Sequence, residues 1–339
     1  QALMVNSLGG PQVTGSKGDV IIDALTVGTL PSSITTTNLV AIFGDNVTIN
    51  STINHKLNSA GGVQLDVDFT LGATKNVTIN KSIGAGANVN ITGNGNIVTA
   101  KGANILSDTD KNGVGGIFIV NNSNTGGSTT QIDGNLDTST ASPADIQVIH
   151  NGVSTAKVVV AGNVTTHQGG DILVWSDGGI DLSGVFMGSD DVSITALGQS
   201  AVIRGPITAD VDGPGNGFIA YAAPFAQTKL HPTAVLSAPN VLLGFADNPT
   251  PLIQSLLGGW IGTNSISGVN ATGGAYAKAA DKPAVQILTN NLTAVGGRLR
   301  ILNDFEAFAG NIGSDAGFIT ANGVGAPTLR AWAASGDFD

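Results

Sequence analysis

The chain has 339 residues, of which only 11% are charged, and its formal net charge is -10. An ordinary soluble domain has roughly 25% charged residues, so a protein built from solvated helices is excluded. The negative charge weighs against nucleic acid as a partner, because contacts to phosphates require clustered Lys and Arg.

The remaining composition favours short strands joined by tight turns. Gly occurs 48 times, which is about twice its usual frequency of roughly 7%, and Glu306 is the single Glu. Gly, Asn and Asp are turn residues, because they tolerate a positive φ or bond their own backbone. Hydrophobic residues make up 41% but aromatic residues only 5%, which predicts a core of Val, Ile, Leu and Ala.

Three features that the sequence lacks, namely Cys, a long apolar run and an initial Met, limit the kinds of protein it can be. There is no Cys, so disulfides and Cys-ligated metals are excluded. No run of about 20 apolar residues exists, so no membrane span is expected. The chain opens at Gln1 without a Met or a charged leader, which is typical of a removed signal peptide or of a piece of a longer protein.

Strand-sized runs with alternating apolar residues follow one another along the chain and are punctuated by Gly, Asn or Asp. A second group of runs appears late in the sequence. The early runs cover residues 19–27, 39–50, 63–71, 76–83, 88–100, 116–122, 144–152, 156–166, 170–186 and 190–207, and the late ones cover 284–304 and 317–323.

The run Asn-Val-Thr-Ile-Asn occurs at Asn46–Asn50 and again at Asn76–Asn80, with weaker copies elsewhere. A repeated strand-turn unit cannot bury its own apolar face, so successive units must stack. The sequence therefore predicts an all-β fold, a parallel β-helix or solenoid of stacked short strands, with about 20 to 25 residues per coil and about 14 to 17 coils. A β-sandwich or barrel is the alternative, since both also have short, evenly spaced strands.

The pattern changes after about residue 209, where a turn cluster and six prolines follow within residues 210–251. Regular ladders are harder to form there. We expect three regions: a β-solenoid over 1–209, an irregular Pro/Gly-rich insertion or altered coils over 210–262, and a continuation of the β-repeat with the C-terminal end over 263–339. A short helix is predicted from Pro251 to just before Gly258.

The runs at 44–54, 76–86, 87–98 and 178–198 resemble the β-helical exoproteins of the filamentous-haemagglutinin type, which include two-partner-secreted adhesins and autotransporter passengers. The resemblance covers about residues 45–207 and lies in the style of the repeat. It implies a right-handed parallel β-helix and an extracellular adhesive role. The Asn-Pro-Asn-Gly type motif of that family's secretion domain is not found in the sequence.

Asp108, Asp110 and Asn112, followed by Gly113, match the opening of a calcium loop, in which alternate oxygen side chains converge. The twelfth position is Ile119 rather than Glu, which excludes an EF-hand. Two interpretations remain, a small repeat-type calcium loop and an ordinary polar turn between coils. No other cofactor is expected.

Asn-x-Ser/Thr sequons are a second class of candidate site. They accept glycans in a secreted chain that meets a glycosyltransferase. A turn Asn followed by Val-Thr on a strand also creates sequons for structural reasons alone. The candidate positions are Asn46, Asn50, Asn76, Asn80, Asn90, Asn121, Asn163, Asn270 and Asn291.

The sequence contains only weak candidates for a group of catalytic residues. The candidate carboxylate pairs are Asp190 with Asp191, Asp171 with Asp181, and Asp210 with Asp212, and none is accompanied by a Gly-His-Gly turn. The histidines and tryptophans are scattered without metal-ligand or sugar-stacking patterns. These residues are His55, His150, His167, His231, Trp175, Trp260 and Trp332. We therefore expect no enzyme and no catalytic residue, with a β-helical carbohydrate-active enzyme as the minor alternative.

The expected function is that of an extracellular, cell-surface structural or adhesive protein that binds through an extended β-solenoid. The alternative is a subunit that assembles into an extracellular filament or layer, because the unpaired strands at the ends of a solenoid can pair with another chain. The expected partner is accordingly a cell-surface ligand or other copies of the chain.

Overall fold

A computed structural model describes residues 4–5, 11–14, 20–22, 40–50, 52–54, 68–199, 201–212, 217–222, 227–230, 235–238, 240–243, 260–263, 268–271, 285–295, 298–301, 305–315, 318–321 and 329–333. Before residue 41 and after residue 238 it describes the backbone alone. The chain forms two compact units, residues 1–172 and 173–339. Secondary structure in the described residues consists of strands, with no helix.

The repeating element is a coil of three short strands separated by turns. Residues 69–84 form one such coil, with strands at 69–73, 77–79 and 83–84. The next coil runs parallel to it in register, since Phe69 pairs with Val89, Val77 with Ile97 and Ile83 with Ile105. Val, Ile and Thr form these strands because branched side chains pack well on a pleated surface. The fold predicted from the sequence, a parallel β-solenoid, is confirmed.

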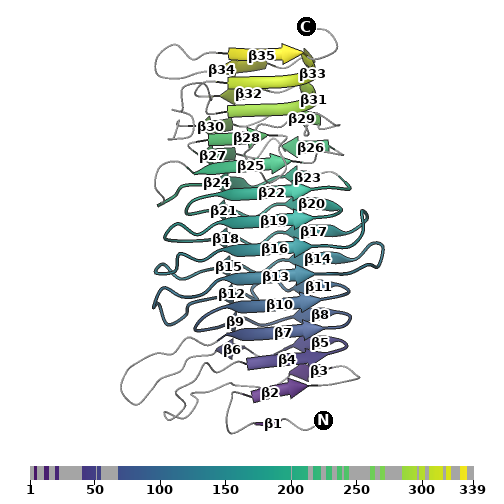
Figure 1. The fold of residues 1–339 in the computed structure, drawn as a ribbon, viewed down its shortest axis with the longest axis vertical. Helices are drawn as coiled ribbons and strands as arrows, with labels where there is room; N and C mark the ends of the chain where they lie inside the picture. The colour runs from purple at the N-terminus through teal and green to yellow at the C-terminus, as the bar shows by residue number, and fades with distance from the viewer. Residues whose placement is uncertain are drawn as a thin grey trace. The chain divides into compact units, whose positions relative to one another are not determined.

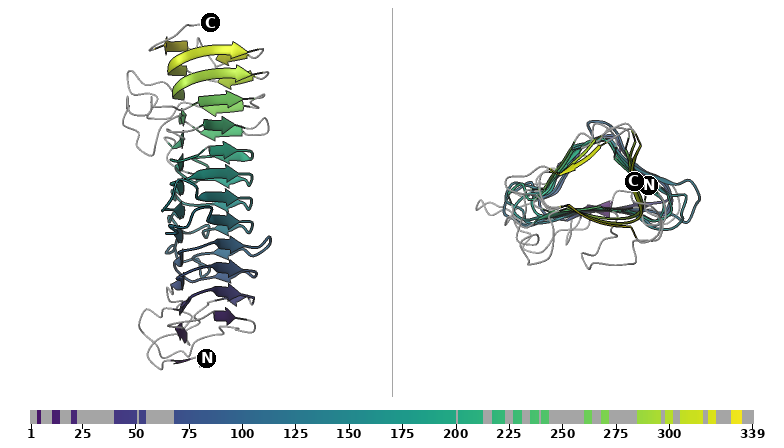
Figure 2. Two further views of the ribbon diagram at one scale, coloured as in Figure 1. Left: turned by 90° about the vertical axis from the view of Figure 1, so that its right-hand side faces the viewer. Right: turned by 90° about the horizontal axis from the view of Figure 1, so that it is seen from above.

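In the first unit the strands form three parallel ladders, one on each side of the core (Figures 1 and 2). The first ladder contains β2 (Pro11–Thr14), β4 (Val40–Gly44), β7 (Phe69–Ala73), β10 (Val89–Gly93), β13 (Ile117–Asn121) and β16 (Ile146–His150). The second contains β3 (Val20–Ile22), β5 (Val47–Ile49), β8 (Val77–Ile79), β11 (Ile97–Thr99), β14 (Thr129–Ile132) and β17 (Lys157–Val160). The third contains β6 (Ile53–Asn54), β9 (Ile83–Gly84), β12 (Ile105–Leu106), β15 (Leu136–Asp137) and β18 (Val164–Thr165). An additional strand, β1 (Met4–Val5), pairs antiparallel with β2.

The second unit repeats the three ladders. The first contains β19 (Ile172–Ser176), β22 (Val192–Ala196), β25 (Phe218–Ala222), β28 (Asn240–Leu243), β31 (Val285–Val295), β33 (Phe305–Asp315) and β35 (Leu329–Ala333). The second contains β20 (Gly179–Leu182), β23 (Ala201–Ile203), β26 (Gln227–Leu230) and β29 (Trp260–Thr263). The third contains β21 (Phe186–Met187), β24 (Pro206–Thr208), β27 (Val235–Ala238), β30 (Gly268–Ala271), β32 (Arg298–Ile301) and β34 (Phe318–Ala321). The long strand β31 pairs with β28 of the first ladder through its N-terminal part and with β29 of the second ladder through its C-terminal part.

The core lies between the three ladders and is filled by alternate strand residues. In β5, Val47 and Ile49 are fully buried, whereas Thr48 between them is partly exposed. The next coil repeats the arrangement with Val77 and Ile79. Because equivalent side chains stack on successive coils, the narrow interior is packed by small aliphatic residues, as the composition predicts.

Coil length departs from the expected 20 to 25 residues. One coil separates Phe69 from Val89, a step of 20 residues, but Ile97 pairs with Thr130, a step of 33. Loops inserted at the corners account for the difference, because they lengthen a coil without adding a strand. The part of the first ladder that the structure describes contains six strands in the first unit and seven in the second.

The region predicted to be irregular or altered, 210–262, contains strands β25 to β29, which pair in parallel with their neighbours. The helix predicted from Pro251 lies outside the described residues.

Candidate functional site

One corner of the first unit carries enlarged loops on successive coils. The chain passes from β9 to β10 through residues 85–88, but from β12 to β13 through 107–116 and from β15 to β16 through 138–145. Residues 166–171 follow β18 in the same way. Neighbouring strands in a ladder lie about 4.8 Å apart, so loops that leave the ladder at the same corner lie side by side. Loops held by a rigid frame are where binding groups concentrate.

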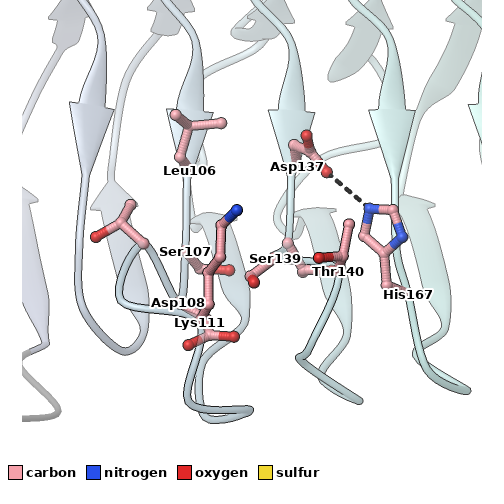
Figure 3. A pocket seen from close by; sticks show the side chains of 10 residues that line it. Leu106, Ser107, Asp108, Lys111, Asp137, Ser139, Thr140 and His167 are labelled. Carbon is pink, nitrogen blue, oxygen red and sulfur yellow. Dashed lines mark hydrogen bonds and ion pairs between the residues drawn. The ribbon is translucent and has the colours of Figure 1, made fainter. Parts of the chain in front are cut away.

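These loops surround a pocket of about 400 Å³ (Figure 3). The strand residues Leu106 and Asp137 line it, together with Lys111, Ser139 and His167 from the three loops. Leu106 and Asp137 are register partners on β12 and β15. The pocket therefore draws on three consecutive coils, and nine of the ten residues that line it, all except Leu106, have a polar or charged side chain.

Asp137 and His167 are hydrogen-bonded to each other at the pocket. Asp137 Oδ1 lies 3.2 Å from His167 Nε2, and the Asp137 side chain is 47% exposed. Partial burial raises the pKa of Asp137, and the hydrogen bond and charge of His167 lower it again only in part. The carboxylate can accept further hydrogen bonds from a ligand. With Nε2–H donated to Asp137, Nδ1 of His167 accepts a hydrogen bond in the neutral ring and donates one when the ring is protonated.

The residues that follow the third ladder on these coils carry hydroxyl groups. Ser107 Oγ donates to the carbonyl of Gly115 at 3.0 Å, and Thr166 Oγ1 donates to that of Gly170 at 2.7 Å. Each bond joins the beginning of its loop to the end of the same loop. At the corresponding position Thr138 is buried, and its Oγ1 makes no hydrogen bond among the described residues.

The predicted calcium loop lies in the first of these loops. The carboxylate of Asp108 is buried and accepts the backbone N–H groups of Asn112, at 2.9 Å, and of Gly113, at 3.2 Å. Asn112 Nδ2 donates to Asp110 Oδ2 at 3.1 Å, and Asn112 Oδ1 accepts the N–H of Val114 at 3.0 Å. Asp108 and Gly113 have φ values of 47° and 92°, which are typical of a tight turn. These contacts favour the polar turn, and calcium binding stays a prediction.

Several predicted sequons form asparagine ladders along the stack. Asn46 Oδ1 accepts from Asn76 Nδ2 at 2.9 Å, and Asn76 Oδ1 accepts the backbone N–H of Asn96 at 2.8 Å. At the next turn, Asn80 Nδ2 donates to Asn50 Oδ1 at 2.7 Å. The Asn46 and Asn76 side chains therefore accept backbone N–H groups at the turns, whereas Asn50 and Asn80 bond to each other through their side chains. These sequons thus have a structural role in the turns.

Asn163 belongs to a similar ladder, because its N–H donates to Asn135 Oδ1 at 3.0 Å, and the N–H of Asn135 donates to Asn104 Oδ1 at 3.1 Å. Asn88 plays the same part at another turn, where its Oδ1 accepts the N–H of Gly116 at 2.9 Å. Sequence reasoning missed Asn88, Asn104 and Asn135 because they are not sequons. Their position directly before a strand was the signal that could have found them.

The remaining sequons differ in accessibility. Asn90 is partly exposed on β10. Asn121 is fully buried, and its Nδ2 donates to Thr130 Oγ1 at 3.1 Å, so a glycan there would require the coil to open. Asn270 and Asn291 lie in β30 and β31, where only the backbone is described.

The predicted carboxylate pairs of the second unit have different partners. Asp190 and Asp210 are neighbours on successive coils, since the N–H of Asp210 donates to the Asp190 carbonyl at 2.8 Å. Partial burial, and then the charge of Asp210, raise the pKa of Asp190. Asp212 accepts a hydrogen bond from Ser189 Oγ. Asp191 directly follows Asp190 at the start of the coil.

The third predicted pair consists of Asp171 and Asp181. The N–H of Asp171 donates to Asp145 Oδ1 at 3.0 Å. Asp181 binds Arg204 with both carboxylate oxygens, at 2.8 Å from Nε and 3.2 Å from Nη2. Asp181 therefore joins two coils through an ion pair.

Of the other single residues, His150 is fully buried, and its two ring nitrogens each lie 3.1 Å from a hydroxyl, Nε2 from Ser128 Oγ and Nδ1 from Thr130 Oγ1. Trp175 Nε1 donates to Asp177 Oδ1 at 3.1 Å. The side chains of Trp260 and Trp332 and the residues His55 and His231 lie outside the described part of the chain.

Comparisons with family models, with curated proteins and with solved structures find no match to this chain. A search of the described residues finds no helix long and apolar enough to cross a membrane.

Proposed function

We propose that the protein is an extracellular surface protein with an adhesive or structural role, and that it binds its partner through the side of the β-solenoid. The observation that carries the proposal is the corner of the first unit, where loops 107–116, 138–145 and 166–171 leave three consecutive coils and line one polar pocket. A binding surface in this design is spread over several coils rather than held in one loop.

The physical basis is that the strand ladders and the core carry the stability of the fold, while the corner loops carry the surface groups. The ladders and the aliphatic core hold each coil in register, so a corner loop can change in length and sequence without disturbing the strands. The step of 33 residues from Ile97 to Thr130 beside the step of 20 from Val77 to Ile97 is an instance. Surface chemistry can therefore vary while the fold stays the same.

The resemblance of the repeats to filamentous-haemagglutinin-like exoproteins supports the extracellular and adhesive parts of the proposal. The contacts of two of the candidate carboxylates favour structural roles for them. Asp181 is held by Arg204, and Asp212 accepts a hydrogen bond from Ser189, and both contacts join successive coils.

The proposal is tested by measuring the attachment of beads coated with the purified chain to a panel of cells and immobilised extracellular polysaccharides. In the decisive variant, loop 138–145 is replaced by the short loop 85–88 of an earlier coil. We expect attachment to fall to the level of uncoated beads while the circular-dichroism spectrum keeps its β-structure.

Two outcomes would contradict adhesion. Filaments that grow with protein concentration in electron micrographs, together with no attachment to any surface, would favour the self-assembling subunit. Release of reducing sugar from a polysaccharide would favour a β-helical carbohydrate-active enzyme.

A further inference from the structure

The pocket between loops 107–116, 138–145 and 166–171 has the chemistry of a ligand site as well as a suitable size. A volume of about 400 Å³ falls within the range of pockets that hold small molecules. Figure 3 shows Asp137, Lys111 and His167 as sticks around the same space, together with hydroxyl side chains such as those of Ser139 and Thr140.

The mixture of groups matches a polyhydroxylated ligand. The carboxylate of Asp137 is acceptor-only when ionised and can receive two neighbouring hydroxyl groups, while Lys111 can only donate. Ser139 and Thr140 can donate or accept, depending on the rotamer, and Nδ1 of His167 accepts in the neutral ring and donates in the protonated one. Sugar hydroxyls both donate and accept, so they can satisfy all of these partners at once.

Two further features of the lining support a sugar ring. The Leu106 side chain is 36% exposed at the pocket and offers an apolar surface to the C–H face of a ring. Thr138 also lines the pocket, and its buried Oγ1 makes no hydrogen bond among the described residues. Buried hydroxyl groups are almost always hydrogen-bonded, so this one has capacity to spare.

The charge of the lining favours a neutral ligand over an anionic one. The carboxylates are those of Asp108 and Asp137, and the basic groups are those of Lys111 and His167. The Asp108 carboxylate is occupied by backbone N–H groups, and His167 is paired with Asp137. Lys111 is then the main cation, whereas a site for phosphate or a polyuronate needs several Arg or Lys donors.

We propose that this pocket binds a neutral saccharide of one or two rings, with Asp137 and His167 as the principal polar contacts. The inference rests on the proposed adhesive function and names the class of ligand for it. It assigns the specificity of attachment to three neighbouring coils of the first unit.

The test is calorimetric titration with cellobiose, lactose and diacetylchitobiose as neutral probes and digalacturonate as the anionic one. We expect at least one neutral disaccharide to bind and digalacturonate to bind more weakly. Asp137→Asn and His167→Gln should each weaken binding by about tenfold or more, because each replaces a charged or ring hydrogen-bonding group with a neutral amide.

Asp133→Asn is the matched control. Asp133 lies in the turn before β15 on the same coil, outside the pocket, and its carboxylate accepts from Gln131 Nε2 at 2.9 Å. This control makes the same change of charge and should leave saccharide affinity unchanged. Melting curves of all variants establish that each one is folded.

Absence of binding for every neutral probe at millimolar concentration would overturn the proposal, and so would binding that Asp137→Asn and His167→Gln leave unchanged. The bead assay distinguishes a failure of the saccharide-pocket proposal from a failure of the adhesion proposal. Attachment by a wild-type chain that binds no saccharide removes the pocket proposal and leaves adhesion in place, whereas saccharide binding without attachment removes adhesion alone.

Discussion

At the scale of single residues, the fold depends on alternation between the two faces of each strand. Val47 and Ile49 point into the core and are fully buried, while Thr48 faces outward. Val47 and Ile49 are in register with Val20 and Ile22 on one neighbouring coil and with Val77 and Ile79 on the other, so an unpaired charge introduced there has no access to water.

We expect Val47→Asp or Ile49→Asp to destabilise the protein by about 3 kcal/mol or more, because an ionised carboxylate would be buried without a partner. Thr48→Asp places the same group on the outward face and should cost less than about 1 kcal/mol. Chemical denaturation of the three variants measures the difference. Equal losses in all three would contradict the alternation.

The contacts of Asp108 predict how the supposed calcium loop behaves. Asp108→Ala removes the acceptor of the Asn112 and Gly113 N–H groups and should cost about 1 to 2 kcal/mol. Because the loss concerns internal hydrogen bonds, the melting temperature should fall equally in calcium and in a chelator. A calcium-dependent rise in the wild-type melting temperature that Asp110→Ala abolishes would instead establish the metal site.

Asp190 provides a prediction about pH. Its pKa is raised in the folded state, so the folded protein holds this proton more tightly than the unfolded chain does, and stability falls as pH rises from the ordinary value of 3.8 through the raised one. At neutral pH, Asp190→Asn should therefore stabilise the second unit. The gain should be less than about 1 kcal/mol, because Asp190 is only partly buried and water screens its repulsion from Asp210. Denaturation at pH 7 and pH 3 checks this, because the gain should vanish at pH 3.

At the scale of elements, side-chain hydrogen bonds hold the turns of successive coils together, as the ladders hold the strands. Asn88 illustrates this, since its Nδ2 donates to Asp68 Oδ1 at 3.0 Å while its Oδ1 accepts the N–H of Gly116 on the following coil. One side chain thus joins three coils at the same corner.

Asn88→Ala should cost about 1 to 2 kcal/mol, because a partly buried backbone N–H loses its acceptor. Asn80→Ala is the control, since exposed Asn80 makes a side-chain bond to Asn50 that water can replace. Its cost should stay below about 0.5 kcal/mol. Urea denaturation compares the two variants, and a larger loss at Asn80 would contradict the importance of the ladder.

The sequence predicts the strands and turns well, because alternation and Asn/Gly punctuation are local signals. The pocket could not be predicted in the same way. Asp137 and His167 are 30 residues apart, and their contact depends on the lengths of two corner loops as well as on the register of β15 with β18. The calcium motif is local and was recognised, but whether the Asp108 carboxylate faces a metal or its own backbone depends on the positive φ values of the loop.

At the scale of the whole molecule, each coil pairs only with its two neighbours in the described ladders. We expect the circular-dichroism spectrum of the complete chain to show β-structure with under about 15% helix. A helical content near one third would require extensive helix in the parts of the chain that the structure does not describe, and would restrict the solenoid to the described residues.

Because each described coil pairs only with its two neighbours, a whole coil can be added during evolution without disturbing the others. The coil from Phe69 to Asn88 ends where Val89 takes the place of Phe69 in the ladder. A tandem duplication of the gene segment for residues 69–88 would therefore insert a complete rung whose strands find ready-made partners above and below. The first unit would grow by about 4.8 Å, and its remaining coils would keep their register. The length of the solenoid and the surface of its corners can thus change separately, the first through whole-coil duplications and the second through insertions in the corner loops.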